Sequence, residues 1–311
     1  MKPEILFLKA FYEPAMAALE QEFIVHKLWE IPGGISGIKR TCANVRATIS
    51  TTTTEVTRAH FEALPKLEIN CCYGPYTTLI DMAAAKERNI IITSTPDSTA
   101  EPVADLTMGM IVALMRRICE ADRFVRSGAW PRQLFPSAVE VRGKTLGIVG
   151  MGRIGREIAK RAVGFDMKIA WHGPHRKDDV AYCYVDSLEQ LARESDCLVV
   201  TCALTPATRN LVDARILEAL GADSFLVNIA RGAIVDEDAL VAALLNKKIA
   251  GAALDVFRDE PNVPDALMHM DNVVLTPHMG TSTREVREER GRKLLADIRA
   301  HFAGKPLMYR V

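Results

Sequence analysis

The segment GIVGMGRIGREIAK, at residues 147–160, restricts the possible folds of this chain more than any other segment. An apolar run leads into glycines with the spacing G-x-G-x-x-G, and a helical pattern follows directly. Gly150 permits a tight turn, Gly152 lets the backbone approach a pyrophosphate, and Gly155 lets helix and strand pack closely. The glycine motif alone is weak evidence, but its strand–loop–helix context predicts a dinucleotide-binding βαβ unit.

Short apolar runs alternate with helical patterns through most of the chain. In the first hundred residues, strands are predicted at EILFL, VRATIS, KLEINCC and NIIIT, with helices at FYEPAMAALEQE, TRAHFEAL and IDMAAAKER between them. A second series of strands comprises KTLGIVG, MKIAW, CLVVTCA, SFLVNIA, IAGAALDVF and NVVLTP. Repeated βαβ units build parallel sheets. The expected fold class is therefore α/β, with two doubly wound parallel-sheet domains, a Rossmann cofactor domain inserted into a flavodoxin-like substrate domain.

The pattern changes near Pro96, and residues 100–127 then predict one long helix that is apolar nearly all round in its first half. A helix of that kind usually lies at a domain or subunit contact. The segment TREVREERGRKLLADIRAHFAG predicts an amphipathic helix that returns to the first domain. We therefore expect residues 1–97 and 281–311 to form the substrate domain, and residues 98–280 to form the dinucleotide-binding domain.

Composition excludes several classes of function. Lys plus Arg and Asp plus Glu are equal at 39 each, so no basic excess indicates a nucleic-acid or membrane-surface partner. No window reaches the roughly 18 apolar residues of a membrane span, and the N-terminal segment lacks a signal-peptide pattern. The 7 cysteines include no CxxC pair, which argues against a disulfide framework and a metal site. We expect a cytoplasmic protein with reduced thiols; a redox pair of Cys71 and Cys72 is the alternative.

A basic cluster stands where a dinucleotide-binding unit usually has an acidic residue. That residue lies about 20 positions after the glycine loop and bonds the adenosine ribose. Counting from Gly152 leads to His172, and His175, Arg176 and Lys177 follow it. These side chains offer donors and positive charge to a 2′-phosphate. The cluster predicts a preference for NADP(H), with NAD(H) still possible; a solvated basic loop is the alternative, and no third ligand supports an HxxH metal pair.

Three ionisable residues follow late strands, at the edge where open α/β sheets bind ligands. Arg231 follows SFLVNIA, Glu260 lies after GAALDVF, and His278 follows NVVLTP. Reduction of a 2-oxo acid needs a cation at the carboxylate and carbonyl oxygens, which the arginine fork suits. It also needs a proton donor, and imidazole titrates near neutral pH. Glu260 would orient His278 and favour its protonated form, while Asp255 is placed to bond the nicotinamide carboxamide.

These motifs resemble those of the D-2-hydroxyacid dehydrogenases, and most closely those of their glyoxylate/hydroxypyruvate reductase branch. The resemblance covers nearly the whole chain and rests on EPVADLTMGMIVALMRRICEADRFVRSGAW, GKTLGIVGMGRIGREIAKR, NIARGAIVDEDALVAAL, LDVFRDEP and NVVLTPHMGTST. It implies Arg231, Glu260 and His278 as the catalytic set, and a homodimer built on the long helix after Pro96. The expected cofactor-binding residues are Gly150, Gly152, Arg153, Ile154, Gly155, His172, His175, Arg176, Cys202, Ile229, Ala230, Asp255 and Gly280.

The basic cluster departs from the family pattern at one position. Members of this branch that favour NADPH read like YHGRRR at this point, whereas this chain has WHGPHR. Pro174 therefore replaces an expected arginine. The predicted NADP(H) preference depends on His175 and Arg176.

A second departure lies in NCCYGPYTTLID, where the family usually has Gly-x-Gly and backbone N–H groups bind the substrate carboxylate. Here Gly74 is followed by Pro75 and Tyr76, and proline has no N–H to offer. We predict a reshaped carboxylate-binding loop at Gly74, Pro75 and Tyr76 that uses the Tyr76 N–H together with Arg231. A simple shift of the loop is the alternative.

The predicted reaction is hydride transfer between NADP(H) and a small 2-oxo acid such as glyoxylate or hydroxypyruvate. The main alternative is a larger 2-oxo acid, such as hydroxyphenylpyruvate or a sugar acid, with Tyr76 lining the pocket. A dinucleotide-sensing corepressor is a third interpretation, which the near absence of tails disfavours. The lack of an appended regulatory domain disfavours a phosphoglycerate dehydrogenase.

Overall fold

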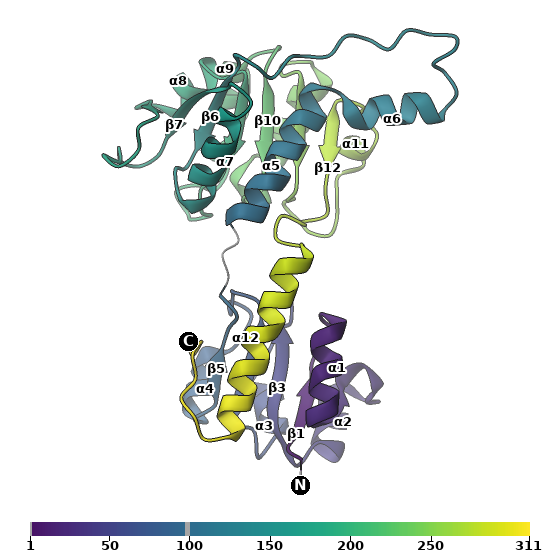
Figure 1. The fold of residues 1–311 in the computed structure, drawn as a ribbon, viewed down its shortest axis with the longest axis vertical. Helices are drawn as coiled ribbons and strands as arrows, with labels where there is room; N and C mark the ends of the chain where they lie inside the picture. The colour runs from purple at the N-terminus through teal and green to yellow at the C-terminus, as the bar shows by residue number, and fades with distance from the viewer. Residues whose placement is uncertain (1, 97–99) are drawn as a thin grey trace. The chain divides into compact units, whose positions relative to one another are not determined.

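The computed structural model describes residues 2–96 and 100–311. Two compact units make up the chain: unit 1 is Met1–Ser98 with Ser282–Val311, and unit 2 is Thr99–Thr281 (Figure 1). The predicted boundary between residues 97 and 98 lies outside the described residues. No helix in the described part of the chain is long and apolar enough to cross a membrane. The functional roles predicted for the two domains stay predictions at this point.

Unit 1 is built on a parallel sheet of five strands in the order β2-β1-β3-β4-β5. This is the flavodoxin-like order, so the predicted class of this domain is confirmed. The strands are β1 Glu4–Phe7, β2 Ile24–Lys27, β3 Val45–Thr51, β4 Ile69–Tyr73 and β5 Ile91–Thr93. The helices are α1 Glu13–Glu22, the short 3-10 helix η1 Leu28–Glu30, α2 Gly34–Thr41, α3 Arg58–Ala63, α4 Met82–Glu87 and α12 Arg284–Phe302.

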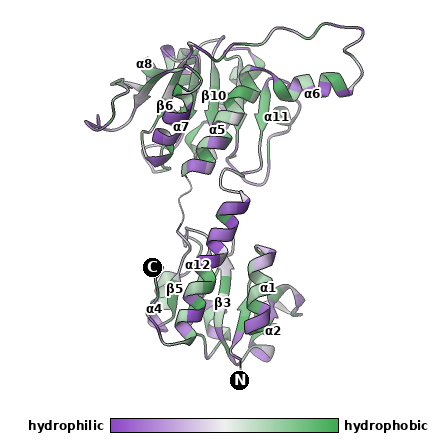
Figure 2. Cartoon of the chain, viewed as in Figure 1, coloured by the Kyte–Doolittle hydropathy of each residue, from purple (hydrophilic) through white to green (hydrophobic). Residues whose placement is uncertain are grey.

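Helices cover both faces of the unit 1 sheet. On one face Leu19 of α1 and Leu294 and Ile298 of α12 are buried against the strands. On the other face Ile38 of α2 and Phe61 of α3 are buried. In Figure 2 the strands of this sheet are mainly hydrophobic, whereas α12 carries many hydrophilic residues. The C-terminal helix belongs to unit 1.

The adjacent cysteines of β4 contribute their side chains to different hydrophobic clusters on the two faces of this sheet. Burial raises the pKa of the Cys71 thiol to about 12 and that of Cys72 to about 11. Since the thiolate is the reactive form, both side chains behave as inert apolar groups. This favours the prediction of reduced thiols over that of a redox pair.

Unit 2 is built on seven parallel strands in the order β12-β11-β10-β9-β6-β7-β8, which confirms the predicted Rossmann class. The order reverses between β6 and β9, where ligands bind in sheets of this kind. The strands are β6 Thr145–Val149, β7 Lys168–His172, β8 Cys183–Tyr184, β9 Cys197–Val200, β10 Phe225–Asn228, β11 Gly251–Leu254 and β12 Val273–Leu275. The helices are α5 Ala100–Met115, α6 Ile118–Arg126, α7 Arg153–Val163, α8 Leu188–Arg193, α9 Ala214–Leu220, η2 Gly232–Ile234, α10 Glu237–Leu245 and α11 Asp265–Met268.

The prediction of one helix over residues 100–127 is wrong, because the structure has two helices there. Arg117 adopts a left-handed conformation, with φ at 54°, which a right-handed helix cannot accommodate. Its guanidinium group pairs with the carboxylate of Glu120 at 2.7 Å. Nine of the 16 residues of α5 are buried in unit 2, whereas no residue of α6 is buried. The two halves of the predicted helix therefore have different surroundings.

Candidate active site

The glycine loop lies at the switch point of the unit 2 sheet, between β6 and α7. Gly150 has φ at 99°, and a Cβ atom there would lie 2.9 Å from the Cα atom of Cys202. A Cβ at Gly155 would lie 2.4 Å from the carbonyl oxygen of Gly150. At Gly152, by contrast, no described atom lies within 4 Å of the Cβ position. Packing therefore requires the first and third glycines, while the second borders open space.

The start of α7 fits the pyrophosphate of a dinucleotide. Gly152 is the N-cap residue and supplies no side-chain cap to the helix amides that follow, beginning at Arg153 and Ile154. No acidic residue lies in the first turn, so the partial positive charge of the helix end is left for an anion. Cys202 follows β9 beside this loop, and burial raises the pKa of its thiol to about 11. The thiol is therefore neutral and does not repel phosphate.

The basic cluster lies close to the glycine loop. His172 is the last residue of β7, and Lys177 donates a hydrogen bond from its ammonium group to the carbonyl oxygen of Met151, at 2.9 Å. This bond places Lys177 against the loop that would hold the pyrophosphate. His175 and Arg176 are both exposed, so their side chains are accessible to a ligand.

Three contacts hold the backbone of this cluster. The Nδ1–H group of His172 donates to the carbonyl oxygen of Val185 at 2.9 Å. The Tyr184 hydroxyl donates to the carbonyl oxygen of Gly173 at 3.1 Å. Arg156 of α7 pairs with Asp179 at 2.8 Å. The segment after β7 is thus attached at both ends, and a basic side chain, not a carboxylate, ends the strand.

His278 and Glu260 form a hydrogen-bonded pair at the carboxyl edge of the sheet. The Nδ1–H group of His278 donates to Glu260 Oε2 at 2.6 Å, with the two side chains 47% and 34% exposed. The other carboxylate oxygen, Oε1, accepts the Phe257 N–H at 3.1 Å. Because Nδ1 faces Glu260, Nε2 is the ring nitrogen that can meet a substrate. His278 has φ at 51°, a conformation rare outside glycine and often found at functional sites.

Asp255 holds the loop that carries His278. Its carboxylate is 2% exposed and accepts the hydroxyl of Thr276 at 2.6 Å and the N–H groups of Met279 and Gly280 at 2.8 and 2.9 Å. A carboxylate has about four acceptor sites, so three donors leave one for a ligand. The predicted bond to the nicotinamide carboxamide stays a prediction, to which the structure adds a role in fixing the loop.

Arg231 lies on a turn that a buried amide fixes. Asn228, at the end of β10, accepts the Ala230 N–H at 3.1 Å and donates to the Arg231 carbonyl oxygen at 3.1 Å. Ile229 and Ala230 are buried beside it. Arg231 is exposed, and its guanidinium donates to the Ala230 carbonyl oxygen at 2.6 Å. Asn228 was not among the predicted site residues, because its partners are backbone atoms that a sequence pattern does not show.

Three neighbouring strands bring the predicted catalytic residues to one edge of unit 2. β10, β11 and β12 are adjacent and parallel, and Arg231, Glu260 and His278 follow them in turn. A Cβ at Gly232 would lie 1.9 Å from the carbonyl carbon of Phe257. The turn of Arg231 therefore packs directly against the loop of Glu260. The arrangement offers a cation, a carboxylate and an imidazole for a small anionic substrate.

The predicted substrate loop lies in unit 1, after β4. Gly74 has φ at 146°, and its N–H donates to the hydroxyl of Thr95 at 2.7 Å. The carbonyl oxygen of Tyr76 accepts the thiol of Cys72 at 3.4 Å, and the tyrosine is 52% exposed. The substrate-binding role of Gly74, Pro75 and Tyr76 stays a prediction.

Comparison with known proteins gives consistent matches. The family model of the D-isomer specific 2-hydroxyacid dehydrogenase NAD-binding domain matches residues 108–280. The glyoxylate/hydroxypyruvate reductase A of Arabidopsis thaliana is 42% identical over 290 residues, 93% of each chain. The hydroxyphenylpyruvate reductase of Plectranthus scutellarioides is 39% identical over 95% of this chain and 96% of its own.

Solved structures agree with these matches. A 2-hydroxyacid dehydrogenase of Ketogulonicigenium vulgare superposes with a TM-score of 0.91 at 38% identity, covering 100% of this chain and 98% of the other. An NADPH-dependent glyoxylate/hydroxypyruvate reductase of Sinorhizobium meliloti, in complex with NADP and malonate, superposes with a TM-score of 0.82 at 31% identity. The match covers 100% of this chain and 97% of that one.

Proposed function

Because this chain belongs to the D-isomer specific 2-hydroxyacid dehydrogenase family, we propose that it reduces a small 2-oxo acid of the glyoxylate or hydroxypyruvate type with NADPH. The 2-oxo acid, NADPH and a proton give the 2-hydroxy acid and NADP⁺. One observation carries the proposal: the pair of His278 and Glu260, joined at 2.6 Å, follows two strands of unit 2 beside the strand that leads to Arg231.

Each residue of this set has a separate task. When bound, the nicotinamide supplies a hydride to the keto carbon. The guanidinium of Arg231 binds the carboxylate and the keto oxygen, because its planar donors match two oxygens. His278 donates a proton from Nε2 to the keto oxygen. Glu260 holds the imidazole through Nδ1, so the donor is oriented before the substrate arrives.

The cofactor is held by unit 2. Gly150, Gly152 and Gly155 with the first amides of α7 would bind the pyrophosphate. His175 and Arg176 would bind the 2′-phosphate, with the ammonium group of Lys177 beside the glycine loop. The NADPH-dependent relative from Sinorhizobium meliloti supports this choice, and NAD(H) remains a usable cofactor within the family.

The cofactor proposal predicts that NADPH binds at least about tenfold more tightly than NADH, a difference of ~1.4 kcal/mol. Replacing Arg176 with alanine should remove most of that difference and leave the affinity for NADH unchanged, since NADH carries no 2′-phosphate. Titration followed by nicotinamide fluorescence measures both dissociation constants. Arg215→Ala, which removes an exposed arginine of α9, is the matched control. Equal affinity of the wild-type protein for both cofactors would show that the cluster is a solvated loop.

A larger 2-oxo acid is the second candidate substrate. The relative from Plectranthus scutellarioides is a hydroxyphenylpyruvate reductase, and this chain has Pro75 and Tyr76 in place of the last two residues of the Gly-x-Gly that is usual in the family. The corepressor interpretation has no comparable support, because the four relatives described above are named as reductases and dehydrogenases.

The oligomeric state and the location of the protein are also predicted. The homodimer predicted on the helix after Pro96 is supported by α6, where Ile118 and Val125 are exposed, and by Trp130 and Leu134 after it, of which Leu134 is 95% exposed. Exposed apolar residues that gather into one patch mark protein contacts. The cytoplasmic location is supported by the cysteines, all of which are free thiols, as expected in a reducing compartment.

A further inference from the structure

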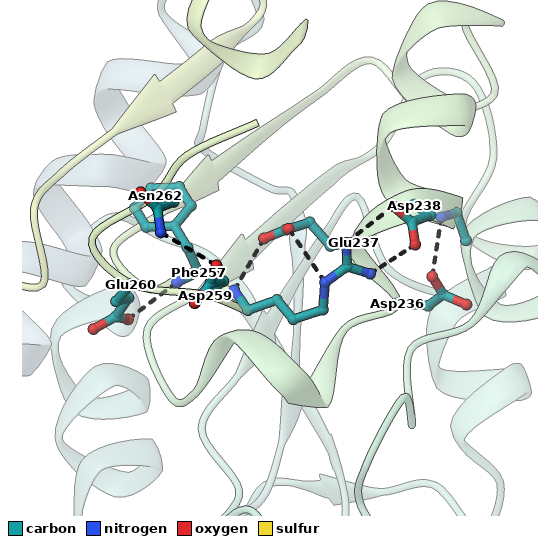
Figure 3. Close-up of polar contacts among 9 residues, drawn as sticks. Asp236, Glu237, Asp238, Phe257, Asp259, Glu260 and Asn262 are labelled. Carbon is teal, nitrogen blue, oxygen red and sulfur yellow. Dashed lines mark hydrogen bonds and ion pairs between the residues drawn. The ribbon is translucent and has the colours of Figure 1, made fainter. Parts of the chain in front are cut away.

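Glu237 has a buried carboxylate that takes no part in the proposed reaction. Glu237 is the first residue of α10, and its side chain is 9% exposed. Carboxylates are almost never buried to that extent unless they have partners. Oε1 of Glu237 accepts the backbone N–H of Arg258 at 3.0 Å, and Oε2 lies 3.7 Å from Nε of the same residue (Figure 3). The helix start also favours the negative charge.

The partner of Glu237 is next to the amide that fixes Glu260. The Phe257 N–H donates to Glu260 Oε1 at 3.1 Å, and the following N–H, of Arg258, donates to Glu237 (Figure 3). The Phe257–Arg258 peptide is planar and rigid. Gly232 packs against its other side, because a Cβ there would lie 2.0 Å from the Phe257 carbonyl oxygen. The peptide is therefore held on one side by α10 and on the other by the Arg231 turn.

We propose that Glu237 is a positioning residue for Glu260, and through it for His278. The proposal rests on the proposed function, since it assumes that the Glu260–His278 pair delivers the proton. Residues 258–262 are exposed, so the loop has little packing of its own to fix the carboxylate. Glu237 anchors this loop to the helix at the Arg258 N–H, one residue after the Phe257 N–H that donates to Oε1 of Glu260. Fixing the backbone at Arg258 limits the movement of Phe257, and with it the direction in which Oε2 of Glu260 meets His278.

Glu237 anchors the loop through its hydrogen bond to the Arg258 N–H and not through its negative charge. The guanidinium of Arg258 already pairs with Asp238 at 2.6 Å, and an exposed pair of that kind contributes little. Glu237→Gln keeps an oxygen that can accept the Arg258 N–H. Glu237→Asp keeps the charge, but it is one methylene shorter and does not reach that N–H. The two conservative variants therefore distinguish a role of the hydrogen bond from a role of the negative charge.

The test measures kcat, both Michaelis constants and the melting temperature of the full chain in NADPH-dependent reduction of hydroxypyruvate. We expect Glu237→Asp and Glu237→Ala to lower kcat by about ten- to a hundredfold, as a displaced catalytic group does, with the Michaelis constant for NADPH unchanged. Glu237→Gln should retain wild-type kcat to within about threefold. Asp213→Ala is the control, because it removes the side-chain N-cap of α9 in the same unit and leaves α10 and the Glu260 loop unchanged; it should lower the melting temperature and leave kcat unchanged.

The decisive comparison places each substitution in the Glu260→Gln background. If Glu237 acts through Glu260, Glu237→Asp should lower kcat no further there, a departure from additivity that marks a shared pathway. If Glu237→Asp lowered kcat in the Glu260→Gln background by as much as it does in the wild type, the positioning role would be overturned and the proposed function would stand. Wild-type turnover of Glu260→Gln would contradict the proposed function, and the positioning role with it. Loss of activity in Glu237→Gln equal to that in Glu237→Asp would assign the effect to charge and also overturn the proposal.

Discussion

Replacing His278 with alanine is expected to lower kcat by about 10²–10⁴-fold, the usual contribution of a positioned general acid. His278 is the imidazole of the site, and its Nε2 atom is the one left for substrate because Nδ1 is bonded to Glu260. Affinity for NADPH should not change, since the cofactor contacts proposed for the glycine loop and the basic cluster involve other residues. Stopped-flow or steady-state turnover together with NADPH titration separates the two effects.

The matched control for this substitution is His269→Ala, which removes an exposed histidine of the same unit just after α11. It should leave both turnover and NADPH binding at wild-type values. A His278→Ala enzyme with unchanged kcat would remove His278 from the proton-transfer role. Loss of NADPH affinity in parallel with kcat would show that His278 itself contributes to cofactor binding, contrary to this prediction.

Replacing Arg231 with lysine is expected to lower kcat/KM by about 10- to 10²-fold, since the lost hydrogen bond to a charged group contributes about 1.5–3 kcal/mol. Lysine keeps the positive charge but not the planar fork that binds two oxygens at once. The loss should therefore include a higher Michaelis constant for the 2-oxo acid, with NADPH affinity retained. Because Asn228 holds the turn through backbone atoms, the substitution should not unfold it.

Steady-state kinetics with the 2-oxo acid varied at saturating NADPH measures this loss. Arg215→Lys, on an exposed face of α9, provides the control for the substitution itself. A variant whose Michaelis constant for the 2-oxo acid equals that of the wild type would mean that the carboxylate binds elsewhere. The backbone N–H of Tyr76, predicted from the sequence, would then become the principal candidate.

Features that depend on local chemistry could be predicted from the sequence. Gly150, Gly152 and Gly155 act within one strand–loop–helix unit, and the structure shows for each the space that its predicted role requires. The positions of Arg231 and His278 could also be predicted, because the carboxyl ends of parallel strands share one edge of a sheet. The two parallel sheets, and the flavodoxin-like and Rossmann classes to which their strand orders belong, follow from the alternating pattern of strands and helices.

Features that depend on contacts between distant residues could not be predicted. Glu237 and Arg258 are 21 positions apart, and their bond joins a side chain to a backbone amide. Asn228 and Asp255 likewise hold loops through backbone groups. The break between α5 and α6 occurs at Arg117, where no glycine or proline marks it. β8 has only two residues, too few for a periodic signal.

The oxidation of NADPH by 2-oxo acids, followed by loss of its absorbance, tests the central claim most directly. The wild-type protein is predicted to consume NADPH with glyoxylate and hydroxypyruvate, to convert hydroxypyruvate to the D isomer of glycerate, and to lose this activity in His278→Ala. A higher kcat/KM with hydroxyphenylpyruvate than with glyoxylate or hydroxypyruvate would assign the larger 2-oxo acid as the substrate. Tight binding of NADPH without turnover of any 2-oxo acid would contradict the account and indicate a dinucleotide-binding protein that is not a reductase.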